Sequence, residues 1–248
     1  PILSIVTSVA LEHRRFLGDT VGAIAREKAG VFRRDTPALT AAAAEALAEL
    51  EAAAGRLGAE LHREPPPGGT YEDANRRLAV RAAALLAAAG WDRLDAEAIE
   101  TGAAVRLPGR LEEVELPGGR RLLLDAAHNP AAVAALVRSL DAPPGETDVL
   151  FGVLTDKDAA GMLPPLADLA RRLVLTRPPG PRGRDPHELP ALLPAGTEAA
   201  IEPDPAAALG RLLDAPPGGR AVVTGSMVLV GAVRKLLRRR FGAPAPVC

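Results

Sequence analysis

Cysteine, lysine and long apolar runs are all scarce in this sequence. The single cysteine, Cys248, excludes a disulfide bond within the chain. No segment has the roughly 18 uninterrupted apolar residues that a membrane-spanning helix needs. The formal net charge of -1 at pH 7 gives no electrostatic footprint for nucleic acid or for an anionic membrane. We therefore expect a cytoplasmic protein with neither nucleic-acid nor membrane partners.

Lysine is much rarer than arginine in this sequence. Only three of the 30 basic residues are lysines, namely Lys28, Lys157 and Lys235. Arginine is used wherever positive charge alone suffices, so a remaining lysine is a candidate for chemistry that needs a primary amine. Lys28 is the first such candidate. The alternative is an ordinary lysine that complements the dipole at the C-terminal end of a helix.

The size of the chain and its pattern of elements favour two domains of class α/β. With 248 residues and 48% hydrophobic content, the chain is long enough for two cores. We place the first domain at 1–104 and the second at 105–248. In the first, strands and helices alternate before a Pro/Gly-rich linker at 65–69 and two further helices. The expected strands are 2–9, 37–40 and 58–62, and the expected helices are 21–29, 42–54, 71–89 and 95–102.

The second half begins with a β-hairpin and then alternates strand and helix to its end. Residues 111–116 and 121–124 flank a Pro-Gly-Gly turn. Such alternation implies a mostly parallel, Rossmann-like sheet. The expected strands after the hairpin are 148–153, 172–176, 199–202 and 220–224, and the expected helices are 131–140, 159–170, 186–193, 205–213 and 227–240.

The most informative segment is Arg121–Pro130, where an apolar run ends in Asp-Ala-Ala-His-Asn-Pro. Ligands of open α/β sheets collect at the carboxyl ends of strands, beside helix N-termini that attract anions. We expect Asp125 and His128 to face such a crevice. In the alternative interpretation, Asp125 or Asn129 merely caps the following helix.

A second segment with polar residues, Thr7 to His13, stands at the end of the first predicted strand. His13 has the chemistry to hold a metal ion through one ring nitrogen. A lone histidine is more often structural than ligating, and a metal site here needs an oxygen ligand nearby. The sequence alone leaves both interpretations open.

Together these segments resemble the folylpolyglutamate synthases and the related dihydrofolate synthases of the Mur ligase superfamily. The resemblance runs in order over nearly the whole chain. It implies an α/β fold made of the remainder of a Mur-ligase-type central ATPase domain, followed by a Rossmann-like C-terminal domain with a mostly parallel sheet. The segments that carry it are 4–8, 12–13, 16–20, 24–32, 107–110, 125–130, 156–158 and 224–226.

The resemblance also implies a reaction and its participants. The family uses ATP and Mg²⁺ to convert a carboxylate of folate or dihydropteroate into an acyl phosphate, which the amine of L-glutamate attacks. It implies that His13 is a metal ligand and that Lys28 is carbamylated, which turns its amine into an oxygen ligand for the ion. Lys28 and His128 are then the catalytic residues. The residues expected to bind nucleotide are Asn75, Arg110 and Asp125.

One family feature is missing, and two alternative functions stay open. No Gly-x-x-x-x-Gly-Lys-Ser/Thr phosphate loop occurs in the sequence, so we expect a chain that lacks the N-terminal region of the family and is incomplete for catalysis. The nearest alternative is a Mur-type peptidoglycan ligase, although the Arg26–Phe32 block favours the folate branch. The other is a non-catalytic α/β module. The family also suggests a monomer.

Overall fold

The computed structural model describes residues 1–11, 17–64, 69–116, 119–214 and 220–242. The chain divides into two compact units, Pro1–Val105 and Arg106–Cys248. Both are α/β with mostly parallel sheets, so the predicted fold class is confirmed. No helix in the described part of the chain is long and apolar enough to cross a bilayer.

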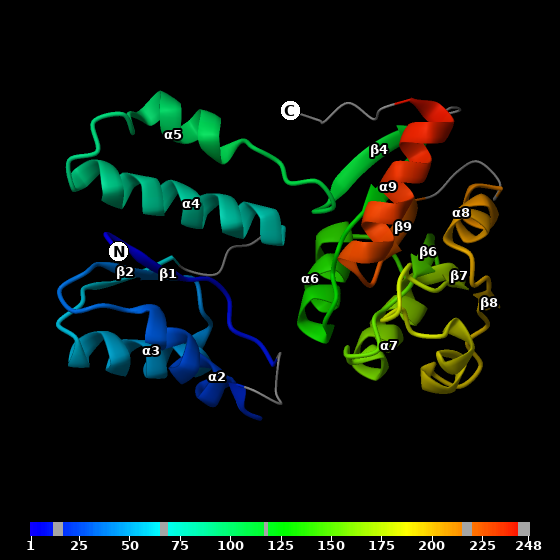
Figure 1. The fold of residues 1–248 in the computed structure, drawn as a ribbon, viewed down its shortest axis with the longest axis horizontal. Helices are drawn as coiled ribbons and strands as arrows, with labels where there is room; N and C mark the ends of the chain where they lie inside the picture. The colour runs from blue at the N-terminus through cyan, green and yellow to red at the C-terminus, as the bar shows by residue number, and fades with distance from the viewer. Residues whose placement is uncertain (12–16, 65–68, 117–118, 215–219, 243–248) are drawn as a thin grey trace. The chain divides into compact units, whose positions relative to one another are not determined.

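The first unit is built on a three-stranded parallel sheet of order β1-β2-β3. Helices α2 and α3 cover one face with an alanine-rich core, and α4 covers the other through Leu78 and Ala82 (Figure 1). The elements are β1 (Ser4–Val6), α2 (Val21–Lys28), η1 (Ala29–Val31), β2 (Ala38–Thr40), α3 (Ala44–Arg56), β3 (Leu61–Arg63), α4 (Tyr71–Ala88) and α5 (Ala96–Ala103).

The first strand is shorter and more exposed than the sequence suggests. We expected a buried strand over 2–9, but β1 has three residues, and Ile5 at its centre is 42% exposed. Among the described strands β1 pairs only with β2. Its other edge therefore carries no strand in the described part of the chain, and the prediction of a buried strand over 2–9 was wrong in its length and in the burial of Ile5.

The second unit is a six-stranded sheet of order β4-β5-β9-β6-β7-β8, in which only the β4–β5 pair is antiparallel. One core packs α6 and α7 against one face, and a second core packs α8 and α9 against the other. The elements are β4 (Glu112–Leu116), β5 (Arg120–Leu124), α6 (Pro130–Leu140), β6 (Thr147–Phe151), α7 (Ala159–Leu169), β7 (Ala170–Leu175), η2 (Pro186–Glu188), η3 (Pro190–Leu192), β8 (Ala200–Ile201), α8 (Pro205–Leu213), β9 (Arg220–Thr224) and α9 (Met227–Phe241).

The predicted helix over 186–193 is not formed. The segment makes two short 3-10 turns, η2 and η3, instead. Pro190 stands four residues after Pro186 and has no N–H to donate to the Pro186 carbonyl, so the α-helical hydrogen bond is missing at this point and continuing the helix is disfavoured. A 3-10 hydrogen bond between residues three apart forms instead, in which the Leu189 N–H donates to Pro186 O at 3.3 Å.

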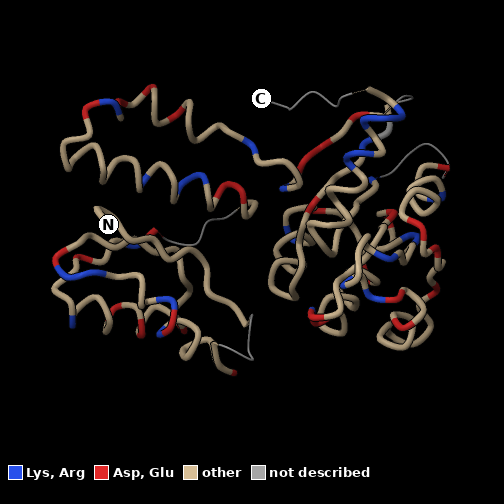
Figure 2. Tube along the Cα trace, viewed as in Figure 1, with Lys and Arg blue, Asp and Glu red and all other residues tan. Residues whose placement is uncertain are grey.

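Charges are spread over both units, with one basic run at the end of α9 (Figure 2). Arg238, Arg239 and Arg240 fill the last helical turn and are exposed. Cations at a helix C-terminus complement its dipole. The run is thus accounted for by the helix end itself.

Candidate functional site

Three helices of the second unit begin at the carboxyl edge of its sheet. Helices α6, α9 and α7 follow the neighbouring strands β5, β9 and β6. Their N-caps are Asn129, Ser226 and Asp158, each of which accepts a backbone N–H from the first turn of its own helix. Helix N-termini attract anions, and the helices that follow β5 and β9 cover opposite faces of the sheet, which is the arrangement that marks the ligand-binding edge of open α/β sheets.

Asp125 follows β5 and ties two loops together. It is only 1% exposed, and its two oxygens accept the backbone N–H groups of Ala127 at 2.9 Å and Leu111 at 3.0 Å. Asp125 does not cap α6, because Asn129 does so through Ala132 N–H at 2.7 Å. The carboxylate therefore shapes the site by holding the backbone on either side of it.

His128 lies in the loop between β5 and α6 at the same sheet edge and is half-buried. Its Nδ1 is 2.9 Å from the carbonyl oxygen of Ala126. A carbonyl only accepts, so Nδ1 is the donor in this bond, and in the neutral form of the ring the lone pair is then on Nε2. This tautomer leaves Nε2 able to accept a proton or a hydrogen bond.

Arg110 is placed beside Asp125 by an unusual turn. Gly109 and Leu111 have φ angles of 71° and 39°, in the left-handed region that a leucine rarely adopts. The Ala126 N–H donates to Gly109 O at 2.9 Å, which joins this turn to the loop after β5. The Arg110 side chain is half-buried and makes no ion pair with a residue that the structure describes. Its charge is available to an anionic ligand.

Gly225 allows the ends of β9 and β6 to approach closely. Gly225 has a φ of 109°, and a Cβ there would lie 2.5 Å from Gly152 O and 2.8 Å from the Phe151 ring. Next to it, the buried Thr224 Oγ1 has no hydrogen-bond partner among the described residues. The backbone of Gly225 and the hydroxyl of Thr224 thus lie together at the carboxyl end of β9.

The other predicted site residues belong to the first unit. Lys28 is the last residue of α2 and is half-buried, whereas Asn75 is exposed on α4. His13 lies outside the described residues. Within the described ranges no group of three His, Cys, Asp or Glu side chains is arranged to hold a metal ion.

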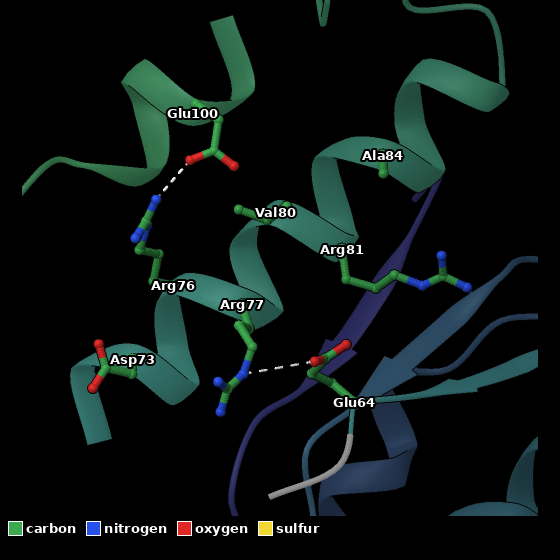
Figure 3. A pocket seen from close by; sticks show the side chains of 8 residues that line it. All are labelled: Glu64, Asp73, Arg76, Arg77, Val80, Arg81, Ala84 and Glu100. Atoms are coloured by element: carbon green, nitrogen blue, oxygen red, sulfur yellow. Dashed lines mark hydrogen bonds and ion pairs between the residues drawn. The ribbon is translucent and has the colours of Figure 1, made fainter. Parts of the chain in front are cut away.

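A charged pocket on the first unit lies along α4 (Figure 3). Arg76 pairs with Glu100 at 2.6 Å, and Arg77 lies 3.8 Å from Glu64. The three arginines of the lining are matched by three carboxylates, so the pocket offers little net charge to a phosphate. It is lined by Glu64, Asp73, Arg76, Arg77, Val80, Arg81, Ala84 and Glu100.

Comparison with known proteins covers both units. Residues 109–227 match the family model of the Mur ligase, glutamate ligase domain. The chain is 30% identical over 273 residues to the folylpolyglutamate synthase of Lacticaseibacillus casei, which covers 96% of this chain and 62% of that protein. It is 33% identical over 210 residues to the dihydrofolate synthase/folylpolyglutamate synthase of Escherichia coli, covering 75% of this chain and 49% of that protein.

The chain is a relative of the folylpolyglutamate and dihydrofolate synthases. Solved structures of this family agree with its fold. E. coli FolC in complex with DHPP and ADP superposes with a TM-score of 0.80 at 28% identity, over 96% of this chain and 62% of that one. The Mycobacterium tuberculosis folylpolyglutamate synthase complexed with ADP and AMPPCP gives 0.78 at 27% identity, over 94% and 63%. The chain thus spans about three fifths of the length of several relatives it matches.

The structure joins three of the predicted site residues and brings two further residues, which the sequence did not reveal, to the same turn. Arg110, Asp125 and His128 lie on one edge of one sheet, linked through backbone hydrogen bonds. The additional residues are Glu112, which accepts the Gly109 N–H of the Arg110 turn, and Arg234, which pairs with Glu112. They are 122 residues apart in the chain, so no local pattern could pair them.

Proposed function

We propose that this chain belongs to an ATP-dependent ligase that adds L-glutamate to a folate or to dihydropteroate. The observation that carries the proposal is the half-buried Arg110 guanidinium, which makes no ion pair with a described residue. Its turn is joined by backbone hydrogen bonds to the loop that carries His128, at the sheet edge where three helices begin. That arrangement suits a phosphate or an acyl phosphate. An alignment with a folylpolyglutamate synthase that covers 96% of the chain, at 30% identity, supports the same reaction.

In this reaction the acceptor carboxylate attacks the terminal phosphoryl group of ATP, giving an acyl phosphate and ADP. The amine of glutamate then attacks the acyl carbon, an amide bond forms, and phosphate leaves. Arg110 and the helix N-termini offset the negative charge on the phosphoryl oxygens. Nε2 of His128 is a suitable acceptor for a proton from the attacking amine, since Nδ1 already donates to Ala126 O.

Asp125 and Asn75 have the supporting roles of holding the site backbone and contacting the nucleotide. Asp125 holds the Arg110 turn and the His128 loop in register through its two backbone hydrogen bonds. Asn75, exposed on α4, contacts the nucleotide. The first domain, 1–104, is then part of an ATP-binding domain, and 105–248 is the ligase domain of a monomeric, cytoplasmic enzyme.

The donor chemistry fits magnesium if Lys28 is modified. A Yersinia pestis relative is described as complexed with AMPPNP and Mn ion, which supports a divalent ion here. His13 and a carbamylated Lys28 would hold the ion, because a carbamate supplies the oxygen that a hard cation prefers. A bound Mg²⁺ supplies positive charge to the phosphates.

Lys28 gives this part of the proposal its own test. Intact-mass or crystallographic analysis of protein prepared with bicarbonate should find one added carbon dioxide on its side chain. Lys235, exposed on α9, is the matched control and should stay unmodified. An unmodified Lys28 paired with a carboxylate would contradict the carbamate.

Substrate choice separates the proposal from its alternatives. The full-length protein is given ATP, glutamate and one acceptor: tetrahydrofolate, dihydropteroate or a UDP-muramoyl peptide. We expect phosphate release with one or both pterin acceptors. Release only with the muramoyl peptide would assign a Mur-type ligase instead. No binding of ATP in a calorimetric titration would favour a non-catalytic module.

A further inference from the structure

The turn that carries Arg110 has an unfavourable backbone conformation, which needs contacts from the surrounding structure to be stable. Gly109 and Leu111 both have positive φ, at 71° and 39°. A non-glycine residue in this region persists only where its surroundings over-determine it. The hydrogen bond from Leu111 N–H to Asp125 accounts for one side of the turn.

Glu112 holds the other side. Its Oε2 accepts the Gly109 N–H at 2.7 Å, while Nε of Arg234 lies 2.9 Å from Oε1 and 2.8 Å from Oε2. The two side chains are 14% and 18% exposed, so the ion pair is largely removed from solvent. Arg234 thereby orients the carboxylate that receives the Gly109 amide.

Helix α9 also contacts the turn directly. Val230 lies one helical turn before Arg234, and its Cγ1 would be 2.9 Å from a Cβ on Gly109. The register of the hairpin places the residues before Glu112 beside those after Leu124, at the carboxyl edge of the sheet. The turn is therefore held between the β5 loop and α9, and Arg110 is its central residue.

We propose that Glu112 and Arg234 are positioning residues that fix the Arg110 guanidinium for the phosphates of ATP. The inference rests on the proposed function, since it needs Arg110 to contact the nucleotide. Replacing a buried ion pair with apolar residues is often neutral for stability. Holding the geometry of the Arg110 turn is a task that such a replacement would not perform.

The test is the KM for ATP of the full-length protein in a mutant cycle. Glu112→Ala and Arg110→Ala should each raise this KM by about tenfold, equivalent to about 1.4 kcal/mol of lost interaction. The double variant should be no worse than Arg110→Ala, because without the guanidinium its placement has no effect on ATP. Glu202→Ala, which removes the exposed Arg211–Glu202 pair, is the matched control and should leave the KM unchanged.

Two milder variants keep the test decisive if Glu112→Ala fails to fold. Glu112→Gln keeps an oxygen for the Gly109 N–H and should raise the KM less than the charge-swapped pair Glu112→Arg with Arg234→Glu. The swap restores an ion pair without that acceptor, so its KM should stay raised even where its melting temperature recovers. A swap that restores the KM would overturn the inference.

The outcomes also separate this inference from the proposed function. An unchanged KM in Arg110→Ala contradicts the role proposed for Arg110, and the inference fails with it. A raised KM in Arg110→Ala together with a normal KM in Glu112→Ala and Glu112→Gln overturns the positioning role alone. Independent, multiplying effects in the double variant would likewise show that Glu112 does not act through Arg110.

Discussion

In the second unit Arg110, Asp125 and His128 are joined through backbone hydrogen bonds on one sheet edge, whereas in the first unit Lys28 and Asn75 lie on separate helices. The sheets beneath them differ as well. Strands β1, β2 and β3 have three residues each, while β4, β5, β6 and β9 have five. The second unit thus fixes its share of the candidate site internally, and in the first unit no such network joins the described site residues.

The largest loss of stability is expected from a substitution at the carboxyl ends of β9 and β6, where the backbones pack closely. Gly225→Ala places a methyl group 2.5 Å from Gly152 O at a φ of 109°, so we expect a loss of about 4 kcal/mol of unfolding free energy from strain and overpacking. Circular dichroism in urea measures the loss.

Trp91 is the only tryptophan of the sequence and lies in the first unit, so its fluorescence reports the unfolding of that unit separately. Its fluorescence transition should stay in place while the circular dichroism transition of the second unit moves. The matched control is Gly210→Ala on α8, where a Cβ meets nothing within 4 Å. Equal stability of both glycine variants would contradict the account of the sheet edge.

The buried ion pair of the second unit should give the next largest effect. Asp148 is fully buried and bonds both Arg171 and Arg172, at 2.8–3.1 Å. Asp148→Asn leaves two guanidinium groups without their carboxylate, and we expect a loss of about 3 kcal/mol in urea unfolding. The exposed Asp168→Asn on α7 should change stability by less than about 0.5 kcal/mol.

The same carboxylate predicts a pH dependence. Burial raises the pKa of Asp148, but the hydrogen bonds and charges of Arg171 and Arg172 outweigh it, so the pKa lies below its ordinary value. The folded state therefore binds fewer protons than the unfolded chain, and the stabilisation is complete above the unfolded pKa of about 3.9 and is lost as pH falls through the folded value. Melting curves should show this acid loss in the wild type and much less of it in Asp148→Asn.

The smallest change in stability is expected from a substitution at Ile5, on the exposed edge strand of the first unit. Ile5→Thr should change the unfolding free energy by less than about 0.5 kcal/mol, because Ile5 is already 42% exposed. Val223→Thr, at a fully buried position of β9, should cost about 2 kcal/mol. A cost for Ile5→Thr as large as that for Val223→Thr would mean that Ile5 is covered in the protein in solution.

Local patterns predicted much of this fold. Alternating strand and helix periods placed most elements of both units, and the polar run after Leu124 marked the sheet edge that carries Asp125 and His128. The pattern failed where a single residue decides the outcome, as at Pro190. It also could not place β9 between β5 and β6, because that order depends on packing between distant segments.

The same limit applies to the candidate site. The Asp-Ala-Ala-His-Asn-Pro run was visible in the sequence, but the burial of Asp125 and the tautomer of His128 depend on backbone partners that a motif does not specify. The Glu112–Arg234 pair joins β4 to α9 across 122 residues. Roles for Lys28, His13 and Asn75 stay predictions.

The most direct test of the central claim is ATP-dependent incorporation of labelled glutamate into tetrahydrofolate or dihydropteroate by the full-length protein. We predict incorporation that requires ATP and falls by at least about tenfold in Arg110→Ala and in His128→Ala, a loss of about 1.4 kcal/mol of transition-state stabilisation each. No incorporation into either acceptor, or undiminished turnover in both variants, would contradict it.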